Sequence, residues 1–309
     1  MKNSLKRNFI NLGLFVLVFA FILVIATLYD LEISKLLTKN VLLPGEYYSI
    51  SIIGRLIEYI GSAPIFLIGS FACLIFIHNI YSLKDKRKYL SLIFVVILIV
   101  LLEKFFGDTL KYYARHHEIE YILDYFYVDL ILWGFALISS AVLLFFYRKV
   151  EVDKNKKLLN FAYVILFTSI FYLLIELIKT PVGRMRYRAM NELGDFSYFT
   201  PWYQISDAKT LLKDTYTLKD AFKSFPSGHT FSAGISYVLI CIPYVFEKFN
   251  TKKWKVIFYL IPICYTGLVA TFRIVVGAHY LSDVLFGGTI AYVASEVFKY
   301  VFILRKKNL

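Results

Sequence analysis

Eight long apolar segments constrain the fold of this chain more than any other feature. A helix needs about 20 predominantly apolar residues to cross the hydrocarbon core of a bilayer. Because lipid offers no partner to backbone N–H and C=O groups, a crossing segment of this kind must be helical or part of a closed barrel. The sequence therefore predicts an all-α, polytopic transmembrane bundle with about eight spans, forming a single membrane domain over residues 1–309. The segments lie near residues 9–29, 61–82, 89–106, 126–147, 158–179, 229–246, 256–273 and 280–304.

The composition agrees with this fold class. Hydrophobic residues make up 59% of the chain and charged residues 18%, against about 45–50% and about 25% in soluble globular proteins. This excludes a soluble enzyme and a disordered chain. The first apolar segment is too long for the core of a signal peptide and lacks a small-residue cleavage site, so we expect a retained span. The three cysteines, an odd number within apolar segments, argue against a disulfide framework.

The net charge of +13 is unevenly distributed along the chain. Five short segments between alternate apolar stretches hold 19 of the 35 basic residues but only four of the 22 acidic ones. Short basic loops stay in the cytoplasm during membrane insertion, so eight spans place all five segments, and both termini, on the cytoplasmic side. The positive charge therefore indicates insertion topology and not a nucleic-acid partner. These segments are residues 1–8, 83–89, 148–157, 247–255 and 305–309.

The loops on the opposite side cover residues 30–60, 107–125, 180–228 and a tight turn at 273–280. The longest, 180–228, is polar and rich in aromatic residues. Aromatic rings favour the membrane interface, so one interpretation is a loop that rests on the bilayer. Long loops are also often functional, and the second interpretation is a lid over a site.

Three clusters of ionisable residues fall on this outer side. Lys179 to Arg186 follows the fifth span, with Arg184 and Arg188 alongside. The segment Phe225-Pro-Ser-Gly-His229 precedes the sixth span, and Arg273 to Asp283 joins the last two. Charged side chains at the edge of membrane helices are costly unless they are paired or hydrated, so they indicate a functional site by default.

His279 and Asp283 carry the first part of the predicted chemistry. They are four residues apart, which places both on one face of a helix. A carboxylate that accepts a hydrogen bond from one imidazole nitrogen fixes the tautomer and raises the basicity of the other nitrogen. This suits a nucleophilic or general-base histidine. Arg273 can hold a phosphate in a bidentate manner.

The other two clusters supply an anion site and a second histidine. Ser227 and Gly228 stand at a helix start, where free backbone N–H groups attract anions, and Lys179 and Arg186 add positive charge. His229 in the first turn can act as a general acid. The arrangement predicts a site for a tetrahedral oxyanion that requires neither a metal nor another cofactor. Each cluster alone also has an ordinary structural explanation as a snorkelling anchor, a turn with a cap, or an ion pair.

The three clusters in this order resemble the signature of the type 2 phosphatidic acid phosphatase family, which shares its site with the vanadium haloperoxidases. The family pattern is Lys, six residues, Arg-Pro; then Pro-Ser-Gly-His; then Ser-Arg, five residues, His, three residues, Asp. All internal spacings match here, and the resemblance covers residues 155–304. Two residues depart from it, since Tyr187 stands in place of the proline and Phe272 in place of the serine.

The resemblance implies a role for each matching residue. His279 is expected to be the nucleophile that forms a phosphohistidine, with Asp283 holding it and His229 protonating the leaving group. The phosphate is expected to bind five residues, namely Lys179, Arg186, Ser227, Gly228 and Arg273. The two departures are expected to alter rate or substrate preference, since neither is a group that forms or breaks a bond.

The implied function is metal-independent hydrolysis of a membrane lipid phosphate or diphosphate on the extracytoplasmic side of the cell membrane. Polyprenyl diphosphate, phosphatidylglycerophosphate, phosphatidic acid and lipid A phosphates are all suitable substrates. A lipid phosphotransferase that uses the same phosphoenzyme is the alternative. A transporter or scramblase, a different class, would place charges near the bilayer midplane. The sequence assigns no specific function to the first four spans, residues 1–150.

Overall fold

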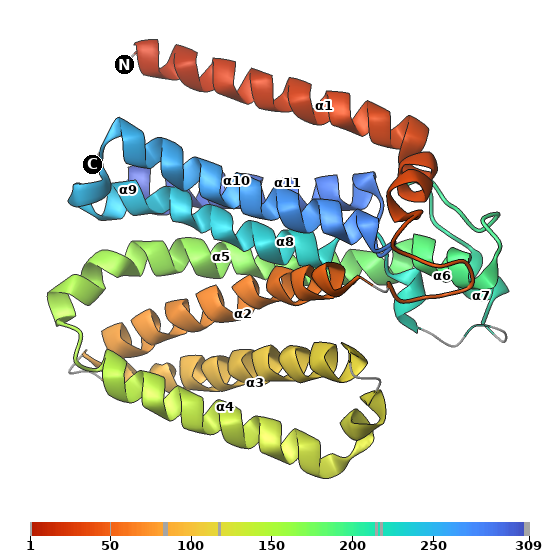
Figure 1. Ribbon diagram of the computed structural model, residues 1–309. Helices are drawn as coiled ribbons and strands as arrows, with labels where there is room; N and C mark the ends of the chain where they lie inside the picture. Colours follow the sequence, from red (N-terminus) through yellow and green to blue (C-terminus); the bar gives the residue numbers. More distant parts are fainter. Residues whose placement is uncertain are drawn as a thin grey trace. The chain divides into compact units, whose positions relative to one another are not determined.

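The computed structural model describes residues 2–49, 51–82, 86–116, 119–213, 216 and 219–305. Across these residues the chain is helical and forms no strand (Figure 1). Eight helical stretches within the described part are long and apolar enough to cross a membrane, which confirms the predicted fold class and number of spans. The long helices are α1 (Lys2–Thr38), α2 (Ile52–Tyr81), α3 (Ser91–His116), α4 (Phe126–Tyr147), α5 (Val152–Val182), α10 (Lys252–Val275) and α11 (Leu281–Lys299).

Several helices extend beyond the apolar segments that predict them. Helix α1 continues to Thr38, although its apolar stretch ends near residue 29, and α2 begins at Ile52 instead of residue 61. Polar residues lower the local hydropathy but still form helical backbone hydrogen bonds. The hydropathy pattern therefore underestimates the length of a helix. Helix α1 bends at Tyr29, whose φ of −132° and ψ of 15° are not helical.

The sixth span is less regular than the others. It consists of α8 (Gly228–Gly234), a 3₁₀ segment (Ile235–Cys241) and α9 (Ile242–Val245). Backbone hydrogen bonding is maintained along the span, while the winding tightens in the middle. The short helix α8 carries Gly228 and His229 in its first turn.

The chain divides into two compact units, and each combines segments from both halves of the sequence. The first unit, called unit 1, contains residues Met1–Ser51, Ile175–Ser227 and Ala270–Gly287. The second, unit 2, contains residues Ile52–Leu174, Gly228–Val269 and Gly288–Leu309. The motif residues Lys179, Arg186, Ser227, Arg273, His279 and Asp283 therefore belong to unit 1, and Gly228 and His229 to unit 2.

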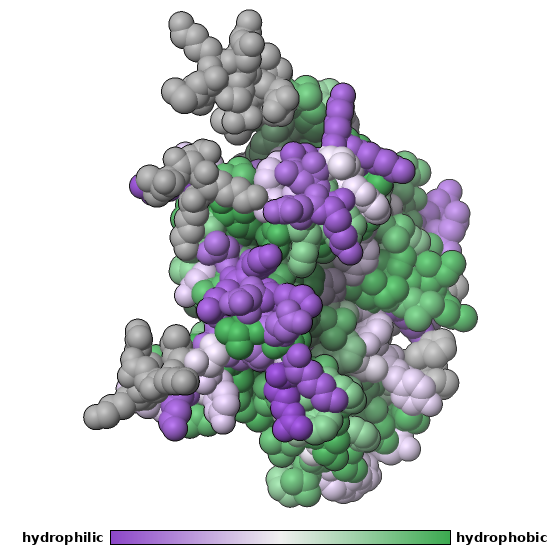
Figure 2. Space-filling model, turned by 90° about the vertical axis from the view of Figure 1, so that its left-hand side faces the viewer, coloured by the Kyte–Doolittle hydropathy of each residue, from purple (hydrophilic) through white to green (hydrophobic). Residues whose placement is uncertain are grey.

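Unit 2 is a helical bundle in which α2 packs against α3 and α8, and α3 packs against α4. Leu130, Ile138 and Phe146 are exposed on α4, as expected for a helix that faces lipid. Basic residues concentrate at the connections from α4 to α5 and from α9 to α10, and hydrophilic side chains gather on this end in Figure 2. This distribution fits the predicted cytoplasmic loops, while the sidedness itself stays a prediction.

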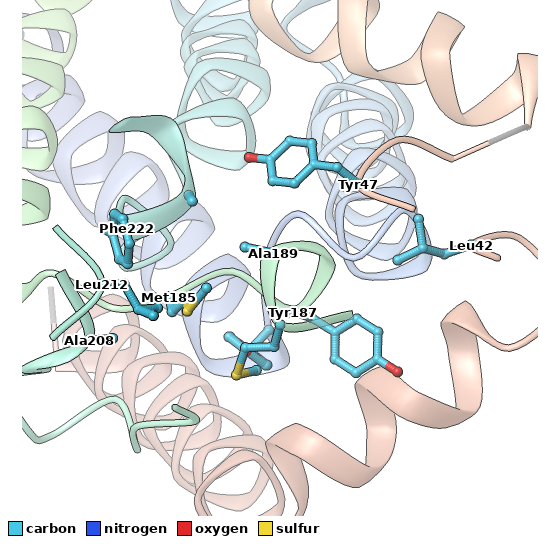
Figure 3. Packing of buried hydrophobic residues seen from close by; sticks show 11 residues of the cluster. Leu42, Tyr47, Met185, Tyr187, Ala189, Ala208, Leu212 and Phe222 are labelled. Carbon is cyan, nitrogen blue, oxygen red and sulfur yellow. The ribbon is translucent and has the colours of Figure 1, made fainter. Parts of the chain in front are cut away.

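In unit 1 the long loop after α5 folds into a packed structure. It contains α6 (Tyr187–Leu193), α7 (Ala208–Leu211) and a 3₁₀ turn (Lys219–Phe222). Figure 3 shows the buried cluster to which these elements contribute, together with Leu42, Tyr47 and Tyr280. Trp202 packs its ring against Phe286, with 5.0 Å between ring centroids. The aromatic residues of this loop thus contribute to the core of unit 1.

Candidate active site

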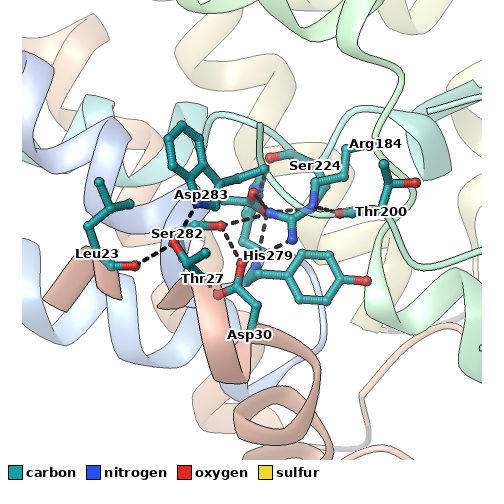
Figure 4. Close-up of polar contacts among 11 residues, drawn as sticks. Leu23, Thr27, Asp30, Arg184, Thr200, Ser224, His279, Ser282 and Asp283 are labelled. Atoms are coloured by element: carbon teal, nitrogen blue, oxygen red, sulfur yellow. Dashed lines mark hydrogen bonds and ion pairs between the residues drawn. The ribbon is translucent and has the colours of Figure 1, made fainter. Parts of the chain in front are cut away.

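Asp283, in the first turn of α11, is the centre of the polar network in unit 1. Its carboxylate accepts hydrogen bonds from Arg184 Nη1 at 2.6 Å, Ser224 Oγ at 2.5 Å and the Tyr280 N–H at 2.9 Å. His279 Nδ1 lies 3.5 Å from Asp283 Oδ2. Asp283 is fully buried, and a buried carboxylate with this many donors is held as the anion. Figure 4 shows how these groups converge.

His279 is positioned by two acceptors at the same ring nitrogen. Nδ1 lies 2.6 Å from the backbone carbonyl of Ser224, closer than the carboxylate of Asp283. A carbonyl oxygen can only accept, so Nδ1 carries the proton and Nε2 holds the lone pair. The predicted pairing with Asp283 is therefore present, but the Ser224 carbonyl is the nearer partner.

The electrostatic environment keeps His279 neutral. Burial lowers the pKa of His279 to about 3; the hydrogen bond to Asp283 acts in the opposite direction, and the positive charges of Arg186 and Arg273 lower the pKa further. A neutral imidazole with the lone pair on Nε2 is the form that can attack phosphorus. The same two guanidinium groups are close enough to act on the ring, as a phosphate bound beside it requires.

Arg184 links this site to the first helix. Its guanidinium is completely buried, donating to Asp283 Oδ1 through Nη1 and to Asp30 Oδ2 through Nη2 at 3.0 Å. Asp30 lies directly after the bend in α1 and accepts from the backbone N–H and the hydroxyl of Ser282. Arg184 Nε donates to the carbonyl of Thr200 at 2.8 Å. The network therefore fixes α1, the loop after α5 and the start of α11 to one another (Figure 4).

Lys179, near the end of α5, and Arg186, in the loop that follows, both have buried side chains. Arg186 occupies the residue position directly before α6, and its Nη2 donates to Asp220 at 3.0 Å. Within the part of the chain that the structure describes, Arg186 Nε meets no hydrogen-bond acceptor, so it can donate to a ligand. Lys179 Nζ donates to Glu176 at 2.5 Å and interacts electrostatically with Arg186. Arg188, in α6, donates from Nη2 to the second carboxylate oxygen of Asp220 at 3.5 Å.

Arg273 and His279 flank a turn that depends on a glycine. The carbonyl of Arg273 accepts the N–H groups of Ala278 and His279, both at 3.1 Å. Gly277 has a φ of +66°, and a Cβ there would approach Leu42, Arg188 and Tyr187 to 3.1–3.2 Å. Only glycine adopts this conformation without strain. The turn brings the buried side chains of Arg273 and His279 to one end of the helix pair α10 and α11.

Ser227 is completely buried, and its N–H donates to the carbonyl of Asp283 at 3.0 Å. Nearby, the N–H of Ser224 donates to the carbonyl of Arg184 at 3.0 Å. Ser227 is thus held against Asp283 by one backbone hydrogen bond, and Ser224 is held against Arg184 by another. Gly228 and His229 follow in α8 of unit 2, where Tyr112 Oη lies 2.7 Å from His229 Nε2.

The two departures from the motif have different structural settings. Tyr187 is the first residue of α6, a position that favours proline because its N–H has no partner within the helix. Here its ring joins the core and lies 5.2 Å from the ring of Phe196, centroid to centroid. Arg186 retains a φ of −72° and a ψ of 148° without the proline. Phe272 is half-buried in the last turns of α10.

Unit 1 thus brings together five of the predicted residues, namely Arg186, Ser227, Arg273, His279 and Asp283, and places Lys179 beside Arg186. No role was expected from the sequence for Asp30, Ser224, Asp220 or Tyr112, and Arg184 was expected only as a neighbour of the motif. An acidic residue directly at the end of an apolar segment, such as Asp30 after the segment 9–29, is a sequence signal that could have identified one of them.

Comparison with known proteins points to one family. Residues 157–307 match the family model described as the PAP2 superfamily. A protein named probable diacylglycerol pyrophosphate phosphatase 1, from Schizosaccharomyces pombe, is 31% identical over 189 residues, covering 56% of this chain and 61% of that protein. A lipid A 1-phosphatase from Rhizobium etli is 29% identical over 161 residues, covering 49% of this chain and 58% of that protein.

The chain therefore spans less than two thirds of the length of these curated relatives. No solved structure gives a significant match.

Proposed function

We propose that the protein, whose residues 157–307 match the PAP2 superfamily model, is an integral membrane phosphatase that hydrolyses a lipid phosphate or diphosphate. The observation that carries the proposal is the state of His279. It is buried and neutral, its Nδ1 proton is directed to the Ser224 carbonyl and Asp283, and two guanidinium groups act on it. This leaves Nε2 as a nucleophile in a site that attracts a phosphate.

In the proposed reaction, Nε2 of His279 attacks phosphorus and the bond from phosphorus to the leaving oxygen breaks. His229 gives a proton to that oxygen, and the products are a phosphohistidine and the lipid with one phosphoryl group fewer: an alcohol from a monoester or a lipid monophosphate from a diphosphate. Water then attacks phosphorus, the N–P bond breaks, and inorganic phosphate leaves while His229 takes up a proton. Lys179, Arg186 and Arg273, with Ser227 and Gly228, bind the phosphate oxygens and stabilise the charge of the transition state.

The substrate class is a lipid that carries a phosphate monoester or a diphosphate. Both named relatives act on phosphorylated lipids according to their names, and the eight apolar spans place this protein in a bilayer. The proposed membrane is the cell membrane. The basic loops are expected in the cytoplasm, and the loops that carry the motif residues alternate with them along the chain, which supports an extracytoplasmic active site.

The test is phosphate release by the purified, detergent-solubilised protein from phosphatidic acid, phosphatidylglycerophosphate, a polyprenyl diphosphate and lipid A. We expect release from at least one class, abolished in His279→Ala and unaffected by EDTA. His78→Ala is the matched control, because His78 lies in α2 and packs against Tyr147. Full activity of the His279→Ala protein would disprove the proposal.

Isotope labelling tests the intermediate. With a ³²P-labelled substrate, alkaline quenching should retain label on the wild-type protein, because N–P bonds survive alkali. The label should be absent from His279→Ala, and the final labelled product should be inorganic phosphate. Label that accumulates in a second lipid instead would identify a phosphotransferase.

A further inference from the structure

His229 makes a short polar contact with a helix outside the family-matched region. Tyr112 Oη lies 2.7 Å from His229 Nε2, and the two rings meet edge to face with 6.4 Å between centroids. Tyr112 lies in α3, within the first 150 residues, whereas the family match begins at residue 157. Both side chains are half-buried. Tyr112 therefore connects the N-terminal spans to a motif residue inside unit 2.

Gly61 of α2 borders the imidazole on another side. A Cβ at Gly61 would lie 3.7 Å from both Cβ and Cδ2 of His229, and only 2.8 Å from Cγ1 of Val269. The absence of a side chain at Gly61 lets the backbone of α2 approach the ring closely. His229 is thus placed between the backbone of one N-terminal helix and the hydroxyl of the next.

The helices that form this setting are themselves tied together. Ser232, one turn after His229, donates from Oγ to the carbonyl of Ser62 at 2.9 Å and accepts from the N–H of Ile65 at 3.3 Å. On α3, the ring of Tyr112 packs against Tyr59 of α2, with 6.3 Å between centroids. These contacts hold α8 and α3 against α2, so the distance from Tyr112 to His229 is set by helix packing and not by a mobile loop.

We propose that Tyr112 is a positioning residue for His229, and that supplying it is one function of the N-terminal spans. The inference rests on the proposed function, in which His229 is the general acid. A tyrosine hydroxyl accepts a hydrogen bond from Nε2–H and can also donate to an unprotonated Nε2. When it accepts from the imidazolium, the proton on Nδ1 is the one given to the leaving oxygen, and Nε2–H stays directed to Tyr112. Neutral His229 then takes a proton back at Nδ1 from the attacking water.

Tyr112→Phe keeps the ring and removes only the hydroxyl. An acid that is poorly oriented matters most when the leaving group is a poor one, such as the alkoxide of a lipid, and least for an activated aryl phosphate. We expect kcat to fall about tenfold or more with the best alkyl lipid phosphate, the scale of a lost hydrogen bond to a charged group. With p-nitrophenyl phosphate we expect a change of less than about twofold.

Tyr59→Phe is the matched control. It removes a hydroxyl in the neighbouring helix, one that contacts Thr109 at 3.1 Å and not a histidine, so kcat should stay at the wild-type value with both substrates. His229→Ala should show the same substrate dependence as Tyr112→Phe, with a larger loss. The double variant Tyr112→Phe, His229→Ala should be no slower than His229→Ala, because the hydroxyl acts through the imidazole. The melting temperature in detergent is measured for every variant.

The outcomes separate this inference from the function on which it rests. If His229→Ala keeps full activity on the alkyl substrate, the general-acid assignment fails and the role of Tyr112 fails with it. If His229→Ala is impaired while Tyr112→Phe matches Tyr59→Phe, only the inference is overturned. An equal loss on both substrates in Tyr112→Phe would show a merely structural role and would also overturn it.

Discussion

Replacing Arg184 tests the claim that a buried ion network holds α1 to the proposed nucleophile turn. The guanidinium has no exposed surface and donates four hydrogen bonds of 2.6–3.0 Å, two of them to the carboxylates of Asp30 and Asp283. Arg184→Gln keeps a polar side chain but removes the charge between two buried anions. Breaking a buried ion pair from one side costs about 3–5 kcal/mol.

The expected change is large enough to measure in detergent. At about 2–4 °C for each kcal/mol in domains of 150–250 residues, a loss of about 3–5 kcal/mol lowers the melting temperature by about 6–20 °C. Membrane proteins often unfold irreversibly, so all variants are compared at one scan rate. The activity should fall as well, because Asp283 loses its shortest contact with a cation. Arg148→Gln is the control, since Arg148 is exposed at the end of α4, and such changes stay within about 0.5 kcal/mol.

A double-mutant cycle separates the ion pair from general damage. Asp30→Asn leaves Arg184 paired with Asp283 and should be milder than Arg184→Gln. If the 3.0 Å contact between Asp30 and Arg184 is energetically real, removing both charges costs less than the sum of the single changes, by about 0.5–3 kcal/mol. Additive effects, within about 0.5 kcal/mol, would refute the reasoning.

Three further predictions concern the turn, the nucleophile and the altered motif position. Gly277→Ala should destabilise the protein by at least about 1–2 kcal/mol and reduce activity, because φ is +66° and three side chains crowd the site; wild-type melting and turnover would contradict this. His279 has a folded pKa of about 3, below the value of about 6.5 in unfolded chains, so below pH 6.5 the unfolded state gains a proton that the folded state does not. As the pH is lowered from about 6.5 to 3, the stability of the protein should therefore decrease, and it should decrease more steeply in the wild type than in His279→Asn. Parallel curves of melting temperature against pH for the two proteins would be inconsistent with a neutral buried ring. Tyr187→Pro should remain active, because Arg186 already has the extended conformation that precedes proline. Its free energy of unfolding should decrease by about 3 kcal/mol, because the variant lacks the buried ring. Phosphate release measures the first effect and thermal melting the second.

Local sequence patterns predicted the elements and the spacing of the site well. The eight spans follow from apolar length. The prediction of one shared helix face for His279 and Asp283 was wrong, because α11 begins at Leu281, but the four-residue spacing still leaves 3.5 Å between Nδ1 and Oδ2. The helix ends were less predictable. Asp30 was expected in an outer loop, yet it lies inside α1, because a single acidic residue is accommodated in a helix when a buried cation pairs with it.

The partners of the site residues depended on long-range packing. The nearest acceptor for His279 Nδ1 is the carbonyl of Ser224, a group that every residue possesses and that no sequence pattern can single out. Asp30 and Arg184 are separated by 154 positions, and Tyr112 and His229 by 117. Nothing in either local segment indicates its partner, since many pairings of buried polar groups satisfy the same sequence.

The sequence by itself determined that this chain is a helical membrane protein, and it placed the residues of the proposed phosphate site in three short segments. Both properties depend on residue types at short spacing, which transfer free energy and helix geometry translate directly into structure. Only the tertiary structure decided which nitrogen of His279 keeps its lone pair and that Arg184 joins Asp283 to α1. It also placed Tyr112, from a span outside the motif, against His229. Those contacts depend on how helices distant in sequence pack, which is a property of the whole fold and not of any segment.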